Sequence, residues 1–498
     1  MNKLKVVGIA YLLIGLIFIP FAIQYQVMGA YTGLSPVIMP GTQVKPYTYC
    51  IWKQGSTYYA TNSLTGAIDY SGTNAGQVIN SGIQATGDIG GGTVFLKGDN
   101  TFNIGSTTIV MNRTRVNLIG EGMSSLITTS NNVPLITITR PVDNPNVQII
   151  RDLALVGPGY TNTNAHAFNI SRSFYNIIEN IYVSDVRDVF HCIETEYLTV
   201  RNVHAEPLSE WGFTGECWRG IYLDNGTNPA DDGGMVFFEE CFFYRPRCTG
   251  VLIQTLEIGR FHRVIVAEPG YGDVAGSDGI GFKIVKPNSY TTFDACESDT
   301  THGDAWHINA ASLHFAYLTI SNCFGFTKPE STGRAIFINS TWGVRITGGE
   351  FRSDQNHVIE IVDSYFVEIG NCELRAHNRL TDPGTYFDGI LLDNAENCRL
   401  HDFHLQTAHT ATGKTGILAT NTCYGTQIVN ANLYGTGGNW PTLINVPEVY
   451  VEALDGFSYQ TSIPTEIVGD GTKVAVYSGG NNYLYIRING AWVSVALT

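Results

Sequence analysis

Ionisable residues recur at one position of a repeating pattern in this sequence. The position lies two residues before an apolar pair spaced i, i+2, such as Trp306/Ile308, and that spacing is typical of a short strand with one buried face. Ten residues occupy it and eight of them are ionisable: His166, Asp188, Arg219, Thr249, Asp278, Asp304, Arg334, His357, Asp388 and Thr415. The unit at Asp278 fits two registers, two residues apart, and we take Ile280/Phe282 as its apolar pair. If the strands stack in parallel, this position forms a column with about 4.8 Å between neighbours.

Paired carboxylates are the groups that most glycosidases use for acid–base cleavage. In this register Asp278 and Asp304 lie on neighbouring units, so their carboxylates should repel and the pKa of one should rise towards that of a general acid. We therefore predict Asp278 and Asp304 as the catalytic pair. Asp388 lies three units beyond Asp304, about 14 Å away, and is a weaker catalytic candidate.

Other polar and aromatic residues share the same predicted face. Cationic and imidazole groups can hold acidic groups or shuttle a proton, and aromatic rings can stack on sugars. The predicted substrate-binding residues are Arg219, Trp218, Tyr222, Lys283, His307, Arg334, His357 and Glu360. The alternative is that polar residues precede strands because turns are polar. The sequence has no Cys-x-x-Cys or His-x-x-x-His spacing, so no metal site is predicted.

A four-residue bend recurs along the chain and sets the positions of these strands. Each bend has an apolar residue, two mostly polar or small residues, and an apolar or small residue. The bends are 150–153, 178–181, 200–203, 238–241, 261–264, 293–296, 320–323, 346–349, 369–372, 400–403 and 428–431. Their spacing averages about 28 residues, which indicates a solenoid of repeated coils. With three short strands per unit, the prediction is a right-handed parallel β-helix of about 11–13 coils.

Ten cysteines are present. Cys241, Cys296, Cys323 and Cys372 share the last position of the bend, where other units carry Leu, Ile, Val or Phe, so we expect them in the interior. Cys50, Cys217 and Cys248 lie outside that ladder and are the expected disulfide formers if the chain is exported.

The two ends of the sequence differ from the repeats. Residues 1–30 have Lys3 and Lys5 before an apolar run, which predicts either a cleaved signal peptide or an uncleaved membrane anchor. Residues 31–72 read as a linker and a small β segment, and 73–456 as the β-helix, opening with a helix capped by Thr73 or Asn74 that covers the first coil. Residues 457–498 alternate in polarity around Asn489-Gly490 and predict a small antiparallel β module. It could cap the last coil, bind a glycan or mediate homo-oligomerisation, for example as a trimer.

Charge limits the partners. The formal net charge of −15, from 29 basic and 44 acidic residues, argues against a nucleic-acid partner, because phosphate binding needs a basic surface. A polysaccharide or cell-surface glycan is the expected partner.

The start of the predicted β-helix resembles the pectate-lyase superfamily. The residues that carry the resemblance are Gly91–Leu96, Gly98 with Phe102, and Leu118–Gly122. In similar polygalacturonases the catalytic carboxylates precede the first strand of consecutive coils, as Asp278, Asp304 and Asp388 do here, but the Asn-Thr-Asp and Gly-His-Gly signatures are absent. The lyase signature Arg-x-Pro-x-Arg is also incomplete at Arg245–Arg247.

Two classes of function follow from these observations. The first is an exported or surface-anchored enzyme, a hydrolase or lyase that cleaves an extended polysaccharide; no cofactor is expected, except Ca²⁺ if it is a lyase. The second is a non-catalytic adhesin, coat protein or tailspike-like protein that binds glycans.

Overall fold

The computed structural model describes residues 46–139, 147–207, 214–224, 234–272, 274–285, 290–376, 389–407, 416–435, 450–455, 473–478, 481–488 and 491–497. For residues 311–316, 407, 433–435 and those from 450 onwards, the structure describes the backbone. The predicted export segment and Asp388 lie outside the described residues. In the parts of the chain that are described, no helix is both long and apolar enough to cross a membrane.

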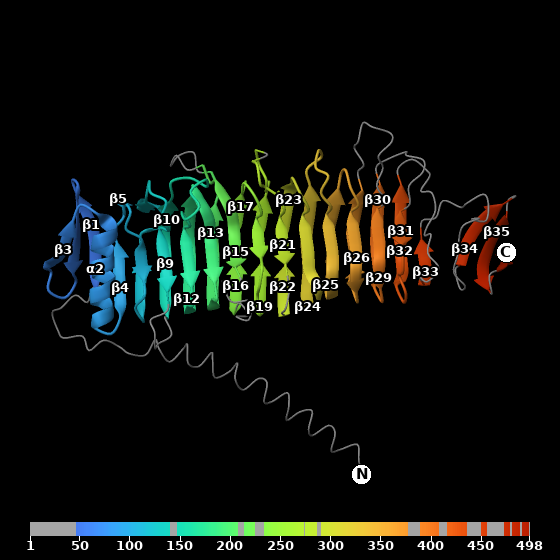
Figure 1. Ribbon diagram of the computed structural model, residues 1–498, viewed down its shortest axis with the longest axis horizontal. Helices are drawn as coiled ribbons and strands as arrows, with labels where there is room; N and C mark the ends of the chain where they lie inside the picture. Colours follow the sequence, from blue (N-terminus) through green and yellow to red (C-terminus); the bar gives the residue numbers. More distant parts are fainter. Residues whose placement is uncertain are drawn as a thin grey trace, which may run out of the picture. The chain divides into compact units, whose positions relative to one another are not determined.

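The repeats form a right-handed parallel β-helix, as predicted. Strands of successive coils lie side by side (Figure 1), and every pairing along the first sheet is parallel. The first sheet contains β6 (Ile109–Met111), β9 (Ile136–Thr139), β11 (Phe168–Ser171), β13 (Val186–Ile193), β15 (Cys217–Asp224), β18 (Val251–Ile253), β21 (Phe282–Val285), the starts of β24 (Trp306–Thr327) and β25 (Ile336–Ser353), β26 (Ile359–Tyr365), β29 (Ile390–Glu396) and β31 (Ile417–Thr420).

The second and third sheets are joined by the predicted bend. The second contains β4 (Gly92–Leu96), β7 (Val116–Ile119), β16 (Met235–Glu239), β19 (Ile258–His262), β22 (Tyr290–Asp294) and β27 (Glu368–Gly370). The third contains β5 (Asn100–Asn103), β8 (Ser125–Thr128), β17 (Phe242–Tyr244), β20 (Ile265–Ala267), β23 (Glu297–Thr301) and β28 (Glu373–Ala376). Seven strands continue from the second sheet into the third: β10 (Gln148–Val156), β12 (Phe174–Ser184), β14 (Glu196–Ala205), the later parts of β24 and β25, β30 (Arg399–Thr407) and β32 (Gln427–Gly435). β33 (Tyr450–Asp455) pairs with β32 across the same bend.

One residue in the left-handed region turns the chain at each predicted bend. The third residue of all eleven bends has φ between 45° and 75°: Asp152, Asn180, Asn202, Glu240, Arg263, Ala295, Asn322, Gly348, Asn371, Asp402 and Asn430. Asn and Asp tolerate this conformation better than other residues with side chains. Some of them also bond between coils, as Asn202 Nδ2 does to Asn180 Oδ1 at 2.8 Å. The repeated Asn in the sequence is therefore explained by backbone geometry.

The interior is filled by stacked apolar side chains. Phe282 stacks on Trp306 with ring centroids 4.2 Å apart, and Phe261 stacks on Phe293 at 4.6 Å. Full burial of such a ring contributes on the order of 1.5–3 kcal/mol. The predicted cysteine ladder is confirmed, because Cys241, Cys296, Cys323 and Cys372 are all at most 3% exposed. The prediction of bridges is wrong: none of the ten cysteines, Cys50, Cys217 and Cys248 included, is in a disulfide.

The predicted helix is α2 (Ala75–Asp88), and the Asn74 side chain accepts a hydrogen bond from Gln77 N at 3.1 Å as its N-cap. Its Val78, Ile79 and Ile83 are buried, and Asn80 bonds to the backbone of residues 108 and 110. Before it, β1 (Tyr49–Gln54), β2 (Thr57–Asn62) and β3 (Ile68–Gly72) pair antiparallel, and β1 also pairs in parallel with β4. A short 3₁₀ helix, η2, spans Gly122–Ser124. The covering role of α2 stays a prediction.

The predicted C-terminal strands form a separate antiparallel sheet of β34 (Lys473–Ser478), β35 (Asn481–Ile488) and β36 (Ala491–Leu497). Its role stays a prediction.

Candidate functional site

Two columns of side chains run along the first sheet, and only the one that alternates with the inward positions faces outward by strand geometry. The column predicted from the sequence runs through Asp188, which pairs directly with Arg219 on the next strand. A second column lies three residues further along each strand. Its members pair in unbroken register: Asn169, His191, Tyr222, Leu252, Lys283, His307, Phe337, Glu360 and Leu391.

The structure corrects the register at Asp278. Val251 pairs with Phe282, and Phe282 pairs with Trp306, so the inward pair of this coil is Phe282/Ile284 and not Ile280/Phe282. The position next to Asp304 is consequently taken by Ile280, which is buried. Asp278 lies two residues earlier and is not opposite Asp304 on the neighbouring strand.

Asp304 is the centre of one polar cluster, which we call the Asp304 cluster: Asp304, His307, Arg334, Phe337 and Glu360. The Asp304 side chain is 6% exposed. Its Oδ1 accepts from Arg334 N and Nε at 2.8 and 2.9 Å, and its Oδ2 accepts from Arg334 Nη2 at 2.9 Å and lies 2.7 Å from His307 Nδ1. Arg334 Nη1 donates to Glu360 Oε2 at 2.9 Å. Each oxygen of the carboxylate therefore has two partners.

Aromatic and cationic groups flank His307 on the adjacent strands. The Phe337 ring lies 4.9 Å from the His307 ring, and the Arg334 guanidinium lies 3.6 Å over the face of Phe337. On the other side Lys283 pairs with His307 in register, and its Nζ donates to Asp278 Oδ2 at 2.7 Å. Because Asp304 binds Nδ1 of His307, the imidazole is oriented with Nε2 as its remaining proton-transfer atom.

Both predicted catalytic carboxylates are held in the ionised form. Burial works against ionisation of Asp304, but the bonds from His307 and Arg334 outweigh it, and its pKa lies below the ordinary value. Burial also opposes ionisation of Asp278, yet the bonds from Lys283 and Thr249 again leave its pKa lowered. The expected repulsion that would raise one pKa is therefore wrong, because each carboxylate is paired with its own cation.

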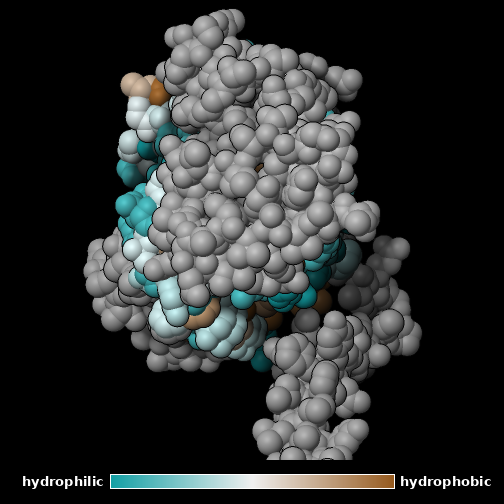
Figure 2. Space-filling view, turned by 90° about the vertical axis from the view of Figure 1, so that its right-hand side faces the viewer, coloured by the Kyte–Doolittle hydropathy of each residue, from teal (hydrophilic) through white to brown (hydrophobic). Residues whose placement is uncertain are grey.

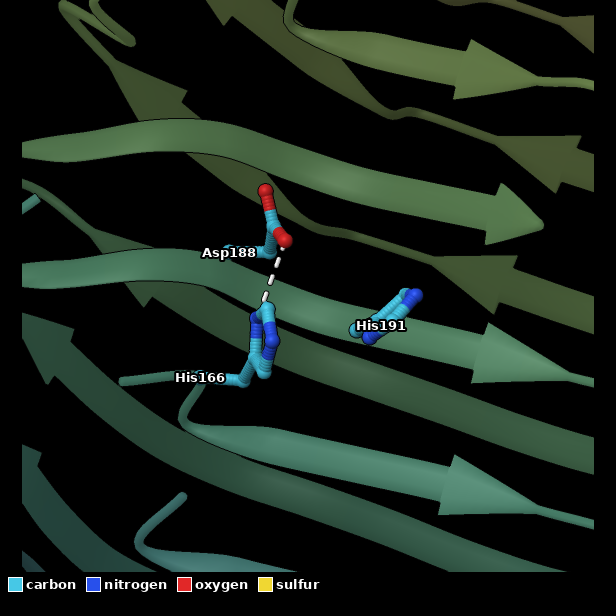
Figure 3. A group of neighbouring side chains, drawn as sticks. All are labelled: His166, Asp188 and His191. Atoms are coloured by element: carbon cyan, nitrogen blue, oxygen red, sulfur yellow. Dashed lines mark ion pairs between the residues drawn. The ribbon is translucent and has the colours of Figure 1, made fainter. Parts of the chain in front are cut away.

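A second polar cluster surrounds Asp188, and we call His166, Asp188, His191, Arg219, Tyr222 and Asp224 the Asp188 cluster. Asp188 is fully buried, and Arg219 donates from Nε to Oδ1 at 2.7 Å and from Nη2 to Oδ2 at 3.2 Å. His166 Nδ1 lies 2.9 Å from Asp188 Oδ2. Figure 3 shows His166 and His191 beside the same carboxylate, with His191 on the strand that carries Asp188.

The ionisation of this cluster follows from burial and its ion pairs. Burial opposes ionisation of Asp188, but His166 and Arg219 outweigh it and lower its pKa. Burial lowers the pKa of His191, and so does His166, which favours neutral imidazole. Burial and Asp224 raise the pKa of Tyr222 to about 12.

The two clusters repeat one constellation on strands four steps apart, about 19 Å along the column. In each, an Asp-x-x-His segment on one strand faces an Arg-x-x-aromatic segment on the next: Asp188/His191 with Arg219/Tyr222, and Asp304/His307 with Arg334/Phe337. The guanidinium forms two bonds to the carboxylate and lies over the aromatic ring in both, at 3.8 Å for Tyr222 and 3.6 Å for Phe337. The clusters differ on the preceding coil, where the first has His166 and the second has Ile280.

Trp218 and His357 are the remaining predicted residues that the structure describes. Trp218 lies on β15 against Tyr160 and under the Arg187 guanidinium, which is 4.3 Å from its ring. His357 lies one strand beyond Arg334, by the register of Ile336 with Ile359. Asp388 lies outside the described residues. The sequence prediction did not include His166, Asp188, His191 or Asp224 as site residues. His166 and Asp188 nevertheless belong to the predicted column of ionisable residues, and His191 belongs to the second, outward-facing column.

In Figure 2, which views the molecule from the right-hand side of Figure 1, the described residues that remain visible are mostly hydrophilic, with a few hydrophobic areas.

Comparison with known proteins gives likenesses in structure but none in sequence. No family model matches the chain, and no curated protein matches it. Among solved structures, it is similar to the A-module of the Azotobacter vinelandii mannuronan C-5 epimerase AlgE6 at 13% identity and a TM-score of 0.49, over 77% of this chain and 96% of that one. Bacteriophage CBA120 tailspike protein 3 is similar at 10% identity and a TM-score of 0.45, over 92% and 72%. The catalytic domain of a GH87 alpha-1,3-glucanase is similar at 11% identity and a TM-score of 0.35, over 89% and 70%.

Proposed function

We propose that this chain is a carbohydrate-active enzyme that cleaves an extended polysaccharide along the outward face of its first sheet. The observation that carries the proposal is the Asp304 cluster, in which a buried carboxylate orients an imidazole between a lysine and an aromatic ring. An Asp–His pair is a common arrangement for general-base catalysis, because the carboxylate fixes the imidazole and stabilises its protonated form.

The roles follow from the contacts. His307 Nε2 is the proposed base, and Asp304 is the positioning carboxylate rather than a proton donor. Phe337 provides a flat apolar surface for a sugar ring, and Lys283 and Arg334 provide donors for its oxygens. Asp278 holds Lys283 in place through the 2.7 Å ion pair.

This arrangement favours cleavage that begins with a base. A retaining glycosidase needs one carboxylic acid and one carboxylate about 5–5.5 Å apart, but here both carboxylates are stabilised as anions. A base can instead remove the carbon-bound proton next to a uronate carboxylate; the C–O bond to the leaving sugar then breaks and a C=C bond forms. The same base can activate water for hydrolysis. Ca²⁺ is a candidate cofactor only for the elimination reaction.

Non-catalytic glycan binding is the second candidate function. The Tyr290 and Tyr317 rings stack at 4.9 Å on the second sheet and are 65% and 56% exposed. Exposed aromatic faces of this kind bind sugars without cleaving them. Export, by a signal peptide or an anchor in residues 1–30, belongs to both proposals.

The test is a panel of neutral and acidic polysaccharides, with reducing ends and unsaturated products measured separately. Cleavage should fall at least about a hundredfold in His307→Gln. The matched control is His262→Gln, because His262 also pairs with an aspartate, Asp294 at 3.2 Å, but lies on the second sheet. Equal activity in wild type and His307→Gln would overturn the assignment of the base, and binding without cleavage of any polymer would favour the second candidate.

A further inference from the structure

The Asp188 cluster has three potential metal ligands from two adjacent coils. One atom each of His166, Asp188 and His191 lie within 4.8 Å of one another (Figure 3). Two imidazoles and one carboxylate form a common protein ligand set for zinc and other divalent transition metals. No short sequence motif marks this set, because the residues come from two coils and meet only through the register of β11 with β13.

His191 has the hydrogen-bonding pattern of a ligating imidazole. Its Nε2 lies 3.2 Å from Asp224 Oδ2, so that nitrogen is assigned to the carboxylate. Its Nδ1 is buried and has no hydrogen-bond partner. Metal-binding histidines commonly give their second nitrogen to a carboxylate in this way, which fixes the tautomer and leaves a lone pair for the ion. A buried ring nitrogen without a partner is otherwise costly.

His166 is the second imidazole of the set, and its Nδ1 already faces the Asp188 carboxylate. Its side chain is 10% exposed, and its Nδ1 lies 2.9 Å from Asp188 Oδ2 without the alignment of a hydrogen bond. The His166 and His191 rings are tilted by 43° with centroids 4.6 Å apart, so they are not stacked face to face. The same carboxylate is fixed by Arg219, whose Nε and Nη2 bind Oδ1 and Oδ2. Arg219 reduces the negative charge available to an ion, whereas Asp224 adds a second carboxylate on the other side of His191.

The Asp304 cluster serves as an internal comparison. It repeats the Asp, His, Arg and aromatic residues, but Ile280 occupies the register position of His166 and provides no ligand. Its imidazole also differs, because His307 Nδ1 is already bound to Asp304. Only the Asp188 cluster therefore combines a third ligand with a partnerless imidazole nitrogen among the described residues.

We propose that His166, Asp188 and His191 bind one divalent transition-metal ion, with Asp224 orienting His191 from behind. The remaining coordination positions would be open to water or to an oxygen of a ligand on the same face, which is the arrangement that distinguishes catalytic from closed structural zinc sites. The proposal does not depend on the cleavage activity of the Asp304 cluster.

Zinc binding to the full chain tests the proposal. Protein stripped with a chelator is titrated with Zn²⁺ by calorimetry, and Co²⁺ is added separately so that its visible absorption reports the ligand geometry. Wild type should bind one equivalent of Zn²⁺ tightly. His166→Ala and His191→Ala should each weaken that step at least about a hundredfold, and Asp224→Asn should weaken it about tenfold, as expected for a residue that supports a ligand.

The matched control is His307→Ala, which removes the equivalent imidazole of the Asp304 cluster and should leave the tight step unchanged. Zn²⁺ should also raise the Tm of wild type and His307→Ala but not of His191→Ala. If either ligand variant fails to fold by circular dichroism, His166→Gln and His191→Gln replace it, since they keep a polar side chain. The proposal would be overturned if wild type binds no Zn²⁺ tightly. It would also be overturned if tight binding survives the substitutions at both His166 and His191.

Discussion

Asp304 and Arg334 form a two-point ion pair between adjacent coils, with Oδ1 bound to Nε and Oδ2 to Nη2, each at 2.9 Å. The Asp304 side chain is 6% exposed, so loss of the carboxylate charge would leave Arg334 partly desolvated with only Glu360 as an anionic partner. Removing one member of a buried pair costs about 3–5 kcal/mol. Asp304→Asn keeps the shape of the side chain. We expect this substitution to lower the free energy of unfolding by about 3 kcal/mol at neutral pH.

The pH dependence of that loss has a defined sign. The folded-state pKa of Asp304 is lowered, so its contribution to stability is fully present above its unfolded value of 3.8 and disappears as the pH falls through the folded value. The difference in the free energy of unfolding between wild type and Asp304→Asn, measured by urea unfolding, should therefore shrink below about pH 4. A difference that stays constant down to pH 2 would show that Asp304 does not stabilise the fold through its charge.

The cysteines give a test of the interior register. Nine of the ten are buried, and Cys50 is the partly exposed one. Burial raises the pKa of Cys241 and of Cys372 to about 12, which keeps the reactive thiolate scarce. Without denaturant, mass spectrometry after alkylation should find Cys50 labelled first and Cys296, Cys323 and Cys372 protected. Rapid labelling of those three would contradict the β-helix register. In addition, Cys372→Asp should cost several kcal/mol, because it buries a charge.

Asn371 tests the left-handed bend without changing the core. It has φ 55° and an exposed side chain, at the third position of the bend that ends at Cys372. A β-branched residue should be strained there, so Asn371→Val should lower the free energy of unfolding by about 1–2 kcal/mol. Asn371→Gly is the matched control and should be within about 0.5 kcal/mol of wild type, since glycine adopts this conformation freely. Equal unfolding midpoints for the two variants would argue against the bend geometry.

The fold could be predicted from the sequence because its signals are local and repeated. The bend residues and the apolar pairs recur once per coil, and cysteines fill the last bend position in four coils, so an error at one coil is corrected by its neighbours. The unit at Asp278 shows the limit. Ile280, Phe282 and Ile284 are all apolar and alternate with other residues, so alternation fits two registers equally, and only pairing with Val251 and Trp306 decides between them. The disulfide prediction failed for a different reason: it depended on spacing and expected export, whereas Cys217 and Cys248 are buried as free thiols.

The site was less predictable because its chemistry depends on pairing between coils. The sequence predicts that Asp304, Arg334 and Asp188 share one column. It does not reveal the two-point ion pairs with Arg334 and Arg219 that keep Asp304 and Asp188 ionised. The duplicated segments Asp188–His191 and Asp304–His307 were visible as Asp-x-x-His, and each is followed about 30 residues later by Arg-x-x-aromatic. Comparing the units with one another, rather than listing single columns, would have found both clusters.

Asp278 and Asp304, which the sequence predicts as a catalytic pair, have different expected roles. Asp304→Asn removes the charge that orients His307 and stabilises its protonated form, so turnover should fall at least about a hundredfold. Asp278 contacts Lys283 and Thr249 rather than His307, so Asp278→Asn should act mainly on KM through a displaced lysine. Steady-state kinetics on the polymer found in the panel would measure both, at a temperature where circular dichroism shows each variant folded. If a detected cleavage activity survives both Asp278→Asn and Asp304→Asn, neither residue belongs to the active site, and the Asp188 cluster becomes the next position to test.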